Sequence, residues 1–232
     1  MSIWTRISAA LSALATGEGL SVVFDRLRRS PDPERSVGFT IAIIALGAKM
    51  AKADGNVTRL EVQAFRRIFT IPPEEEANAA RVFNLARQDV TGFDAYARNI
   101  AAMFRRHPDN RALFIDLIEG LFQVALADDE LHDAEDAFLA HVARVFGLDE
   151  VCYRAIRARL VAGSDRDPFD LLGVAHDAPL DQIRIAWREA VKNSHPDIMI
   201  ARGVPPEAVA LATRRLIAIN QAWDEISARH AA

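Results

Sequence analysis

The tripeptide His195-Pro196-Asp197 combines an imidazole, a rigid backbone and a carboxylate within three positions. Proline fixes its own φ angle and restricts the residue before it, so this segment presents His195 and Asp197 in a limited range of directions. The Asp197 carboxylate can accept a charge-assisted hydrogen bond from an arginine of another molecule. The sequence offers no supported nucleophile–base set, metal triad or phosphate-binding loop. The residues therefore favour recognition over catalysis, and we do not expect the chain to be an enzyme.

A basic stripe precedes the tripeptide. Arg184, Arg188 and Lys192 are spaced four apart, so they fall on one face of a predicted helix. A second face of the same helix is apolar and comprises Ile183, Ala186, Trp187, Ala190 and Val191. By itself, a basic stripe of this kind is typical of a solvated helix surface.

Capping signals define two further helices around this stripe. Asp167 can cap a short helix with Pro168 at its first position, and Gly173 can end it. Its apolar face comprises Phe169, Leu171 and Leu172. After the tripeptide, apolar residues three and four apart predict a helix from about Pro206 to Ala228 that packs on the basic helix. These seam residues are Val209, Ala212, Leu216, Ile219, Trp223 and Ile226.

The lead-in, the basic helix, the tripeptide and the last helix together resemble the J domain of DnaJ-type co-chaperones, over residues 165–232. The resemblance implies a DnaK-type ATP-dependent chaperone as partner and stimulation of its ATPase as activity, with no chemistry on the J domain itself. It implies that the tripeptide engages the partner near its interdomain linker and that the basic stripe docks on its negatively charged surface. The implied partner-binding residues are His195, Pro196, Asp197, Arg184, Arg188 and Lys192.

The sequence departs from the J-domain pattern at two positions and contains a second copy of the tripeptide. Pro179 stands where family members often have Ser or Thr, and it keeps a helix-start signal. Ile198 stands where Lys is common, so one positive charge is lost and partner choice is expected to be weakened or retuned. A second copy of the tripeptide, His107-Pro108-Asp109, lacks the lead-in. We predict that it is a structural turn between a helix that ends at Arg106 and one that begins near Asp109.

The middle of the chain contains an internal repeat. Residues 53–61 and 127–135 share an Ala-Asp start, an apolar fifth position and a final Glu. Each copy follows an apolar helix, Ile41 to Met50 in one case and Leu113 to Ala125 in the other. Each copy also precedes a segment with the apolar spacing of a buried helix. The repeated unit is therefore a helix, an acidic turn and a second helix.

This repeat resembles the TerB family, an all-α domain, over about residues 36–155. A TerB-like domain followed by a C-terminal J domain resembles the DjlA-like bacterial co-chaperones. The second copy has Asp129 where the first has Gly55. Because a residue with a Cβ adopts a left-handed conformation less readily than glycine, we expect the two turns to differ in shape.

The acidic turns raise the question of a metal site. Clusters of oxygen ligands can hold calcium or magnesium, and the candidate ligands are Asp54, Glu61, Asp128, Asp129 and Glu135. The spaced Asp and Asn ligands and the central Gly of an EF-hand loop are missing. We therefore predict that these carboxylates cap helices near their positive ends, with no metal and no cofactor. The alternative function is a stress- or metal-responsive interaction module that acts through these turns.

Composition narrows the class of protein. The chain has 232 residues and a net charge of −4, so charge gives no reason to expect nucleic acid as a partner. Cys152 is the only cysteine, which excludes an intrachain disulfide and fits a reducing compartment. No stretch alternates with a period of two, so the predicted fold class is all-α. It comprises a TerB-like helical domain with an internal repeat and a short helical-hairpin J domain.

The N-terminal segment has two readings. Its apolar residues recur at helical spacing, but Glu18 and its flanking glycines interrupt the run of about 20 residues that a spanning helix needs. We predict a helix that packs on the following domain; the alternative is peripheral membrane contact through residues 1–28, and self-association stays open. The predicted divisions are residues 1–30, 31–163 and 165–232. The predicted location is the cytoplasm, with association at the inner membrane surface as the alternative.

Overall fold

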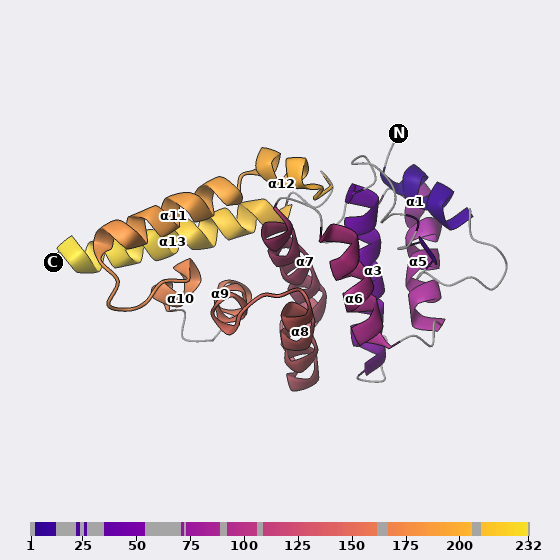
Figure 1. Ribbon diagram of the computed structural model, residues 1–232, viewed down its shortest axis with the longest axis horizontal. Helices are drawn as coiled ribbons and strands as arrows, with labels where there is room; N and C mark the ends of the chain where they lie inside the picture. Colours follow the sequence, from indigo (N-terminus) through magenta and orange to yellow (C-terminus); the bar gives the residue numbers. More distant parts are fainter. Residues whose placement is uncertain are drawn as a thin grey trace.

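The computed structural model describes residues 3–12, 22–23, 26, 35–53, 71, 73–88, 92–105, 109–161, 167–205 and 210–231. Within these ranges every regular element is a helix, so the predicted all-α class is confirmed. Figure 1 shows two groups of helices along the long axis, one that contains α1 to α9 and one that contains α10 to α13. Helices α7 and α9 lie where the two groups meet.

Helix α3, Arg35–Ala53, is the centre of the first group. Every residue from 37 to 50 in it is buried. Helices α1, α5, α6, α7 and α8 all contact it, and a helix covered on all sides needs an apolar surface all round. The surrounding helices are α1 (Ile3–Ser12), α5 (Glu76–Gln88, after a 3-10 turn at Pro73–Glu75), α6 (Phe93–Phe104), α7 (Asn110–Ala125) and α8 (Asp133–Val145).

Two features of α3 show how tightly this centre is packed. The ammonium of Lys49, although buried, lies over the Tyr96 ring at 4.8 Å from its centroid, a favourable cation–π contact. Helix α7 approaches α3 at Gly120. A Cβ on Gly120 would lie 2.4 Å from Cδ1 of Ile43, so only glycine fits this approach without a shift of the neighbour.

The N-terminal helix α1 packs on the first group, as predicted. Ile3 and Ile7 are buried in the core that α3 organises, and α1 contacts both α3 and α5. The glycines that interrupt the N-terminal apolar run, Gly17 and Gly19, lie outside the described residues. Among the helices of the described ranges, none combines the length and the apolar character needed to cross a membrane.

The second copy of the repeat is described from end to end. Helix α7 leads into a 3-10 turn, η3 (Leu126–Asp128), and then into α8 and α9 (Glu150–Leu160). Asp129 adopts the left-handed conformation, with φ +67° and ψ 9°. Aspartate tolerates this conformation better than most residues because its short polar side chain can bond locally. The first turn, residues 54–60, lies outside the described ranges, so the predicted difference in shape stays a prediction.

The second group is a hairpin closed by a short helix. It comprises α10 (Pro168–Leu172), α11 (Leu180–Asn193), α12 (Pro196–Arg202) and α13 (Ala210–Ala231). Helices α11 and α13 lie side by side and run in opposite directions (Figure 1). The predicted caps of α10 are confirmed. The Asp167 carboxylate accepts a hydrogen bond from the Phe169 N–H at 2.9 Å, and Gly173 ends the helix with φ +66°.

The hairpin has its own core. Its buried residues are Phe169, Leu171, Leu172, Ile183, Ile219, Ala222 and Ile226. The rings of Trp187 and Trp223 stack across α11 and α13 with centroids 4.9 Å apart. The packing seam predicted for α13 is confirmed at Ile219, Trp223 and Ile226, but Ala212 departs from it and is buried in the first core instead.

Candidate functional site

The tripeptide begins a helix and does not lie in an open loop. His195 is the N-cap of α12, with φ −66° and ψ 132°, and Pro196 occupies the first helical position. Proline is favoured there because its φ is already helical and it has no N–H that needs a partner. The Nδ1 atom of His195 accepts a hydrogen bond from the Asp197 N–H at 3.2 Å. The tripeptide is thus the capped start of a seven-residue helix.

Both polar side chains of the tripeptide face water. The side chains of His195 and Asp197 are 59% and 87% exposed, with 3.9 Å between Nδ1 and the Asp197 Oδ2. Because Nδ1 accepts a backbone N–H, the neutral ring carries its proton on Nε2. His195 therefore offers a donor, and Asp197 offers an acceptor, at the surface of the same short turn.

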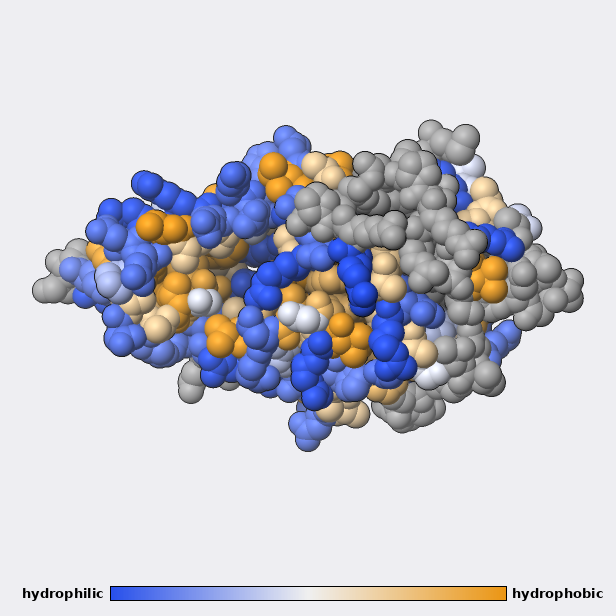
Figure 2. All heavy atoms as spheres, in the orientation of Figure 1, coloured by the Kyte–Doolittle hydropathy of each residue, from blue (hydrophilic) through white to orange (hydrophobic). Residues whose placement is uncertain are grey.

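The side chains of the three basic residues before the tripeptide differ in exposure and in their contacts. Arg188 and Lys192 are exposed on α11. Arg184 is half-buried; it donates to the Asp181 carboxylate at 3.3 Å, and its guanidinium lies over the Trp223 ring at 5.8 Å. Figure 2 shows a largely hydrophilic surface over the upper side of the hairpin, where α11 lies in Figure 1. The Arg184 guanidinium is therefore partly engaged in contacts within the hairpin, whereas Arg188 and Lys192 face solvent.

The apolar face of α11 lies as predicted. Ile183 is fully buried, and Trp187, Ala190 and Val191 pack against the hairpin core. The Trp187 indole N–H donates to the side-chain oxygen of Asn220 on α13 at 3.0 Å. Packing and a cross-helix hydrogen bond together fix the rotation of α11, so Arg188 and Lys192 face solvent while Arg184 lies against Trp223 of α13.

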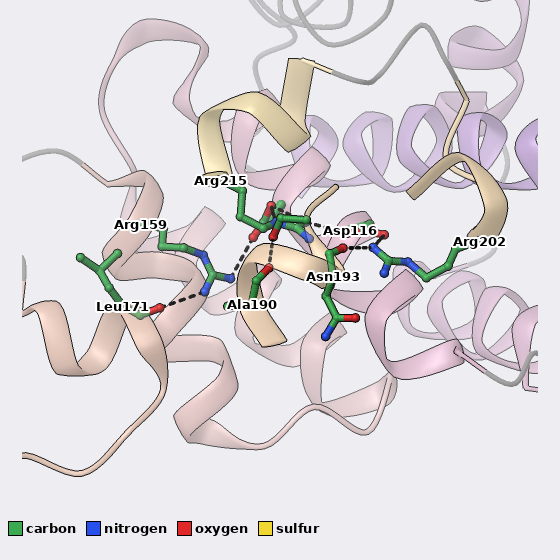
Figure 3. A network of polar contacts seen from close by, with 9 residues as sticks. Asp116, Arg159, Leu171, Ala190, Asn193, Arg202 and Arg215 are labelled. Carbon is green, nitrogen blue, oxygen red and sulfur yellow. Dashed lines mark hydrogen bonds and ion pairs between the residues drawn. The ribbon is translucent and has the colours of Figure 1, made fainter. Parts of the chain in front are cut away.

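The end of α12 belongs to a buried network of charged residues (Figure 3). Arg202, the last residue of α12, donates from one nitrogen to Asp116 of α7 at 3.0 Å and to the Asn193 carbonyl at 2.8 Å. The side chains of Arg202 and Asp116 are 3% and 0% exposed. This pair therefore ties the end of α11 and the end of α12 to a helix of the first group.

The network continues along α7 to α9 and α13. Arg215 of α13 donates to Asp116 at 2.6 Å and, through Nε, to Glu119 at 2.8 Å. Arg159 of α9 donates to Glu119 at 2.8 Å and to the Leu171 carbonyl at 3.3 Å. Two carboxylates on α7 thus hold three arginines from three other helices.

Burial and charge oppose each other in this network. Burial raises the pKa of Asp116 despite the neighbouring Arg215 and Arg202 guanidinium groups. Burial acts the same way on Glu119, but Arg215 and Arg159 outweigh it and the pKa of Glu119 lies below its ordinary value. Burial opposes the charged form of Arg215, but the two carboxylates more than offset it and raise its pKa. Arg215 therefore stays charged throughout the physiological range.

The sequence reasoning missed all five network residues. Asp116 and Glu119 interrupt the otherwise apolar run of α7, three residues apart on one side of a helix. A carboxylate inside a buried helix requires a partner, because an unpaired buried charge is strongly destabilising. This signal was present in the sequence, but it does not say which of the many arginines is the partner.

The comparison with known families concerns the first group of helices. The family model described as "Tellurite resistance protein TerB" matches residues 40–158, which is half of the chain and runs from α3 into α9. The chain belongs to the TerB family. The TerB match contains Asp116 and Glu119, whereas the tripeptide and α10 to α13 lie beyond it.

Curated relatives extend over most of the chain. It is 27% identical to the co-chaperone protein DjlA of Photobacterium profundum over 228 residues, which covers 85% of this chain and 80% of that protein. The DjlA of Shewanella oneidensis is 24% identical over 218 residues, covering 88% and 82%. The DjlA of Escherichia coli K12 is 21% identical, covering 97% of each chain. The resemblance to DjlA-like proteins is confirmed. No solved structure matches the chain.

In the described acidic turn of the TerB domain, one candidate metal ligand, Glu135, is used within the fold. Glu135 is buried and accepts a hydrogen bond from the His132 N–H at 3.1 Å, which caps α8. Asp129 is exposed. In the part of the chain that the structure describes, no three His, Cys, Asp or Glu side chains are grouped so that they could hold a metal ion. Asp54, Glu61 and the side chain of Asp128 lie outside that part.

The duplicate tripeptide lies between two TerB-domain helices. Helix α6 ends at Phe104, and α7 begins at Asn110 with Asp109 as its N-cap. The predicted helix end and helix start are therefore confirmed to within two residues. His107 and Pro108 themselves lie outside the described residues.

Proposed function

We propose that this protein is a co-chaperone that stimulates the ATPase of a DnaK-type chaperone through His195-Pro196-Asp197. The observation that carries the proposal is the geometry of the tripeptide. His195 and Asp197 are exposed, on a short helix whose opposite side is buried. The relatives named as co-chaperones, which align over most of the chain, support the same reading.

The basic residues and the tripeptide make different contributions to binding. The exposed cations Arg188 and Lys192 meet a negatively charged surface of the partner, and Arg184 adds part of its charge. Such complementary charges act mainly on the rate of encounter and on orientation. Asp197 accepts from a partner arginine, and charge-assisted bonds of this kind are among the stronger hydrogen bonds. No bond is made or broken on this chain, so hydrolysis takes place entirely on the partner.

The deciding experiment is single-turnover ATP hydrolysis by a bacterial DnaK-type chaperone. The intact chain is expected to accelerate hydrolysis, and His195→Gln is expected to abolish the acceleration while the circular dichroism spectrum stays the same. His107→Gln is the matched control, because it makes the same substitution in the duplicate tripeptide. A folded intact chain that gives no acceleration would refute the proposal, as would an equal loss in both variants.

Charge reversal tests the basic stripe separately. Arg188→Glu and Lys192→Glu are expected to raise the concentration of this protein needed for half-maximal stimulation. Arg144→Glu, an exposed arginine on α8, makes the same change in net charge away from the hairpin and is expected to leave that concentration unchanged. The effect should shrink at high salt, because exposed charges are screened within about 10 Å at 0.1 M.

The proposal also bears on location. An ATP-hydrolysing chaperone as partner implies that the hairpin acts in the cytoplasm, which is part of the same proposal. Peripheral membrane contact through residues 1–28 and self-association stay predictions. Sedimentation with vesicles of anionic lipid, and analytical ultracentrifugation of the full chain, would measure each directly.

A further inference from the structure

Arg202 joins the two ends of the segment that carries the tripeptide. It is the last residue of α12, the helix that begins at Pro196, and its Nη2 atom donates to the Asn193 carbonyl at 2.8 Å. Asn193 lies two residues before His195. The same Nη2 atom donates to Asp116 at 3.0 Å (Figure 3). One buried side chain therefore holds both ends of the segment and fastens them to α7.

Apolar contacts on the same side of α12 complete the attachment. Met199 is fully buried in the first core, three residues before Arg202 and therefore on the same face of the helix. Val204, after the left-handed turn at Gly203, is buried there too. On the other side, Asp197 is 87% exposed. Burial of one face of α12 thus leaves Asp197 on the solvent side of the helix.

We infer that Asp116 and Arg202 are positioning residues: through them the TerB domain holds the tripeptide in the direction in which the partner reads it. This inference rests on the proposed function and adds to it. The C-terminal hairpin has its own core, yet the orientation of its tripeptide is set by Asp116 of α7, which lies 86 positions before Arg202 in the chain. Neither residue contacts the partner, because both are buried.

Loss of the attachment has a specific kinetic signature. A freed segment samples several directions, and the partner binds the competent fraction only, so the apparent dissociation constant rises in inverse proportion to that fraction. A competent fraction of about one tenth raises the half-maximal concentration about tenfold. Saturating amounts restore the competent state, so the maximal stimulation is retained. Removal of a contact group such as His195 lowers the maximum instead.

The test uses the full chain with Arg202→Gln, which removes the charge opposite Asp116. Arg214→Gln is the matched control, because Arg214 is exposed on α13 and contacts Gln123 outside the Arg202 pair. For Arg202→Gln we expect amide hydrogen exchange across residues 195–204 to accelerate at least about tenfold, the half-maximal concentration to rise about tenfold, and the maximum to change less than twofold. Arg202→Lys, which keeps the charge, should recover part of the affinity.

Each outcome decides between the two proposals. A folded Arg202→Gln variant with the exchange and half-maximal concentration of the intact chain overturns the positioning role, as does an equal change in Arg214→Gln. If Arg202→Gln fails to fold, Asp116→Asn keeps the side-chain shape and one acceptor oxygen and replaces it in both measurements. If the intact chain stimulates no ATPase, the proposed function fails, and hydrogen exchange alone then decides whether the pair fixes the segment.

Discussion

Replacement of Arg215 by methionine is expected to be among the most destabilising changes of a charged residue in this chain. Arg215 is 7% exposed and donates to Asp116 at 2.6 Å and to Glu119 at 2.8 Å. Methionine fills similar space without charge, so both carboxylates stay buried with one arginine each, Arg202 for the first and Arg159 for the second. Each carboxylate loses one charge-assisted hydrogen bond worth about 1.5–3 kcal/mol, and relief from burying the guanidinium offsets part of this loss, so the expected cost is about 3–5 kcal/mol.

This magnitude is easily measured. For a protein of 150–250 residues, 1 kcal/mol shifts the melting temperature by about 2–4 °C, so Arg215→Met is expected to lower it by about 6–20 °C. Urea denaturation followed by circular dichroism gives the change in free energy of unfolding. Tryptophan fluorescence gives a second probe weighted towards the hairpin, since two of the three tryptophans, Trp187 and Trp223, stack across α11 and α13. Coincidence of the two transitions shows whether the hairpin unfolds together with the TerB domain.

The matched control is Arg229→Met on the same helix. Arg229 pairs with Glu225 one turn away, and both side chains are at least half exposed. Exposed pairs of this kind are worth about 0.3–0.5 kcal/mol, so this variant should unfold almost as the intact chain does. A cost below about 1 kcal/mol for Arg215→Met, or equal costs for the two variants, would refute the reading of the network as a buried set whose charges depend on each other.

Three further predictions concern other parts of the fold. Gly120→Ala should cost about 1–3 kcal/mol in urea denaturation because its Cβ meets Ile43, and Ile43→Val, which removes the obstructing methyl, should restore part of that loss. Asp129→Gly should stabilise the chain by up to about 1 kcal/mol, because glycine adopts the left-handed φ of +67° without strain, whereas Asp129→Ala should destabilise it. Equal effects of the two substitutions would contradict this explanation. The hydrogen bond from His141, supported by a neighbouring arginine, holds the pKa of Asp94 below its ordinary 3.8. That stabilisation is present above 3.8 and is lost as pH falls through the lower folded pKa, so Asp94→Asn should lower the melting temperature at pH 7 and the difference should vanish in strong acid. A difference that is constant from pH 7 to pH 2.5 would argue against the pair.

Local sequence signals predicted the hairpin well. The Asp167 cap, the Gly173 stop and the apolar face of α11 each involve residues within a few positions of one another, and each is present in the structure. Periodicity likewise predicted α7 and the packing of α13 at Ile219 and Ile226. These features depend on backbone geometry and on one face of one helix, which a sequence displays directly.

Long-range pairing was beyond the same reasoning. The bond between Arg202 and Asp116 joins residues 86 positions apart, and Ala212 is buried in the first core and not in the core of the hairpin. The sequence contains 28 Lys and Arg residues, and no local pattern selects one of them for a given carboxylate. The N-cap role of His195 was missed for a different reason, because histidine is not among the residues that usually cap helices.

The attachment of α12 to α7 uses a buried ion pair, Arg202 with Asp116, and this has a physical consequence. Apolar residues of similar volume often stabilise a fold as well as a buried ion pair does or better, because the charges must lose their hydration. Met199 and Val204 already supply such apolar contact for α12. What the guanidinium adds is direction: its planar donors require Asp116 and the Asn193 carbonyl at fixed angles, which apolar contact does not. The pair is therefore better suited to setting the orientation of α12 than to holding it in place, and orientation is what a binding partner needs from an exposed tripeptide on a seven-residue helix.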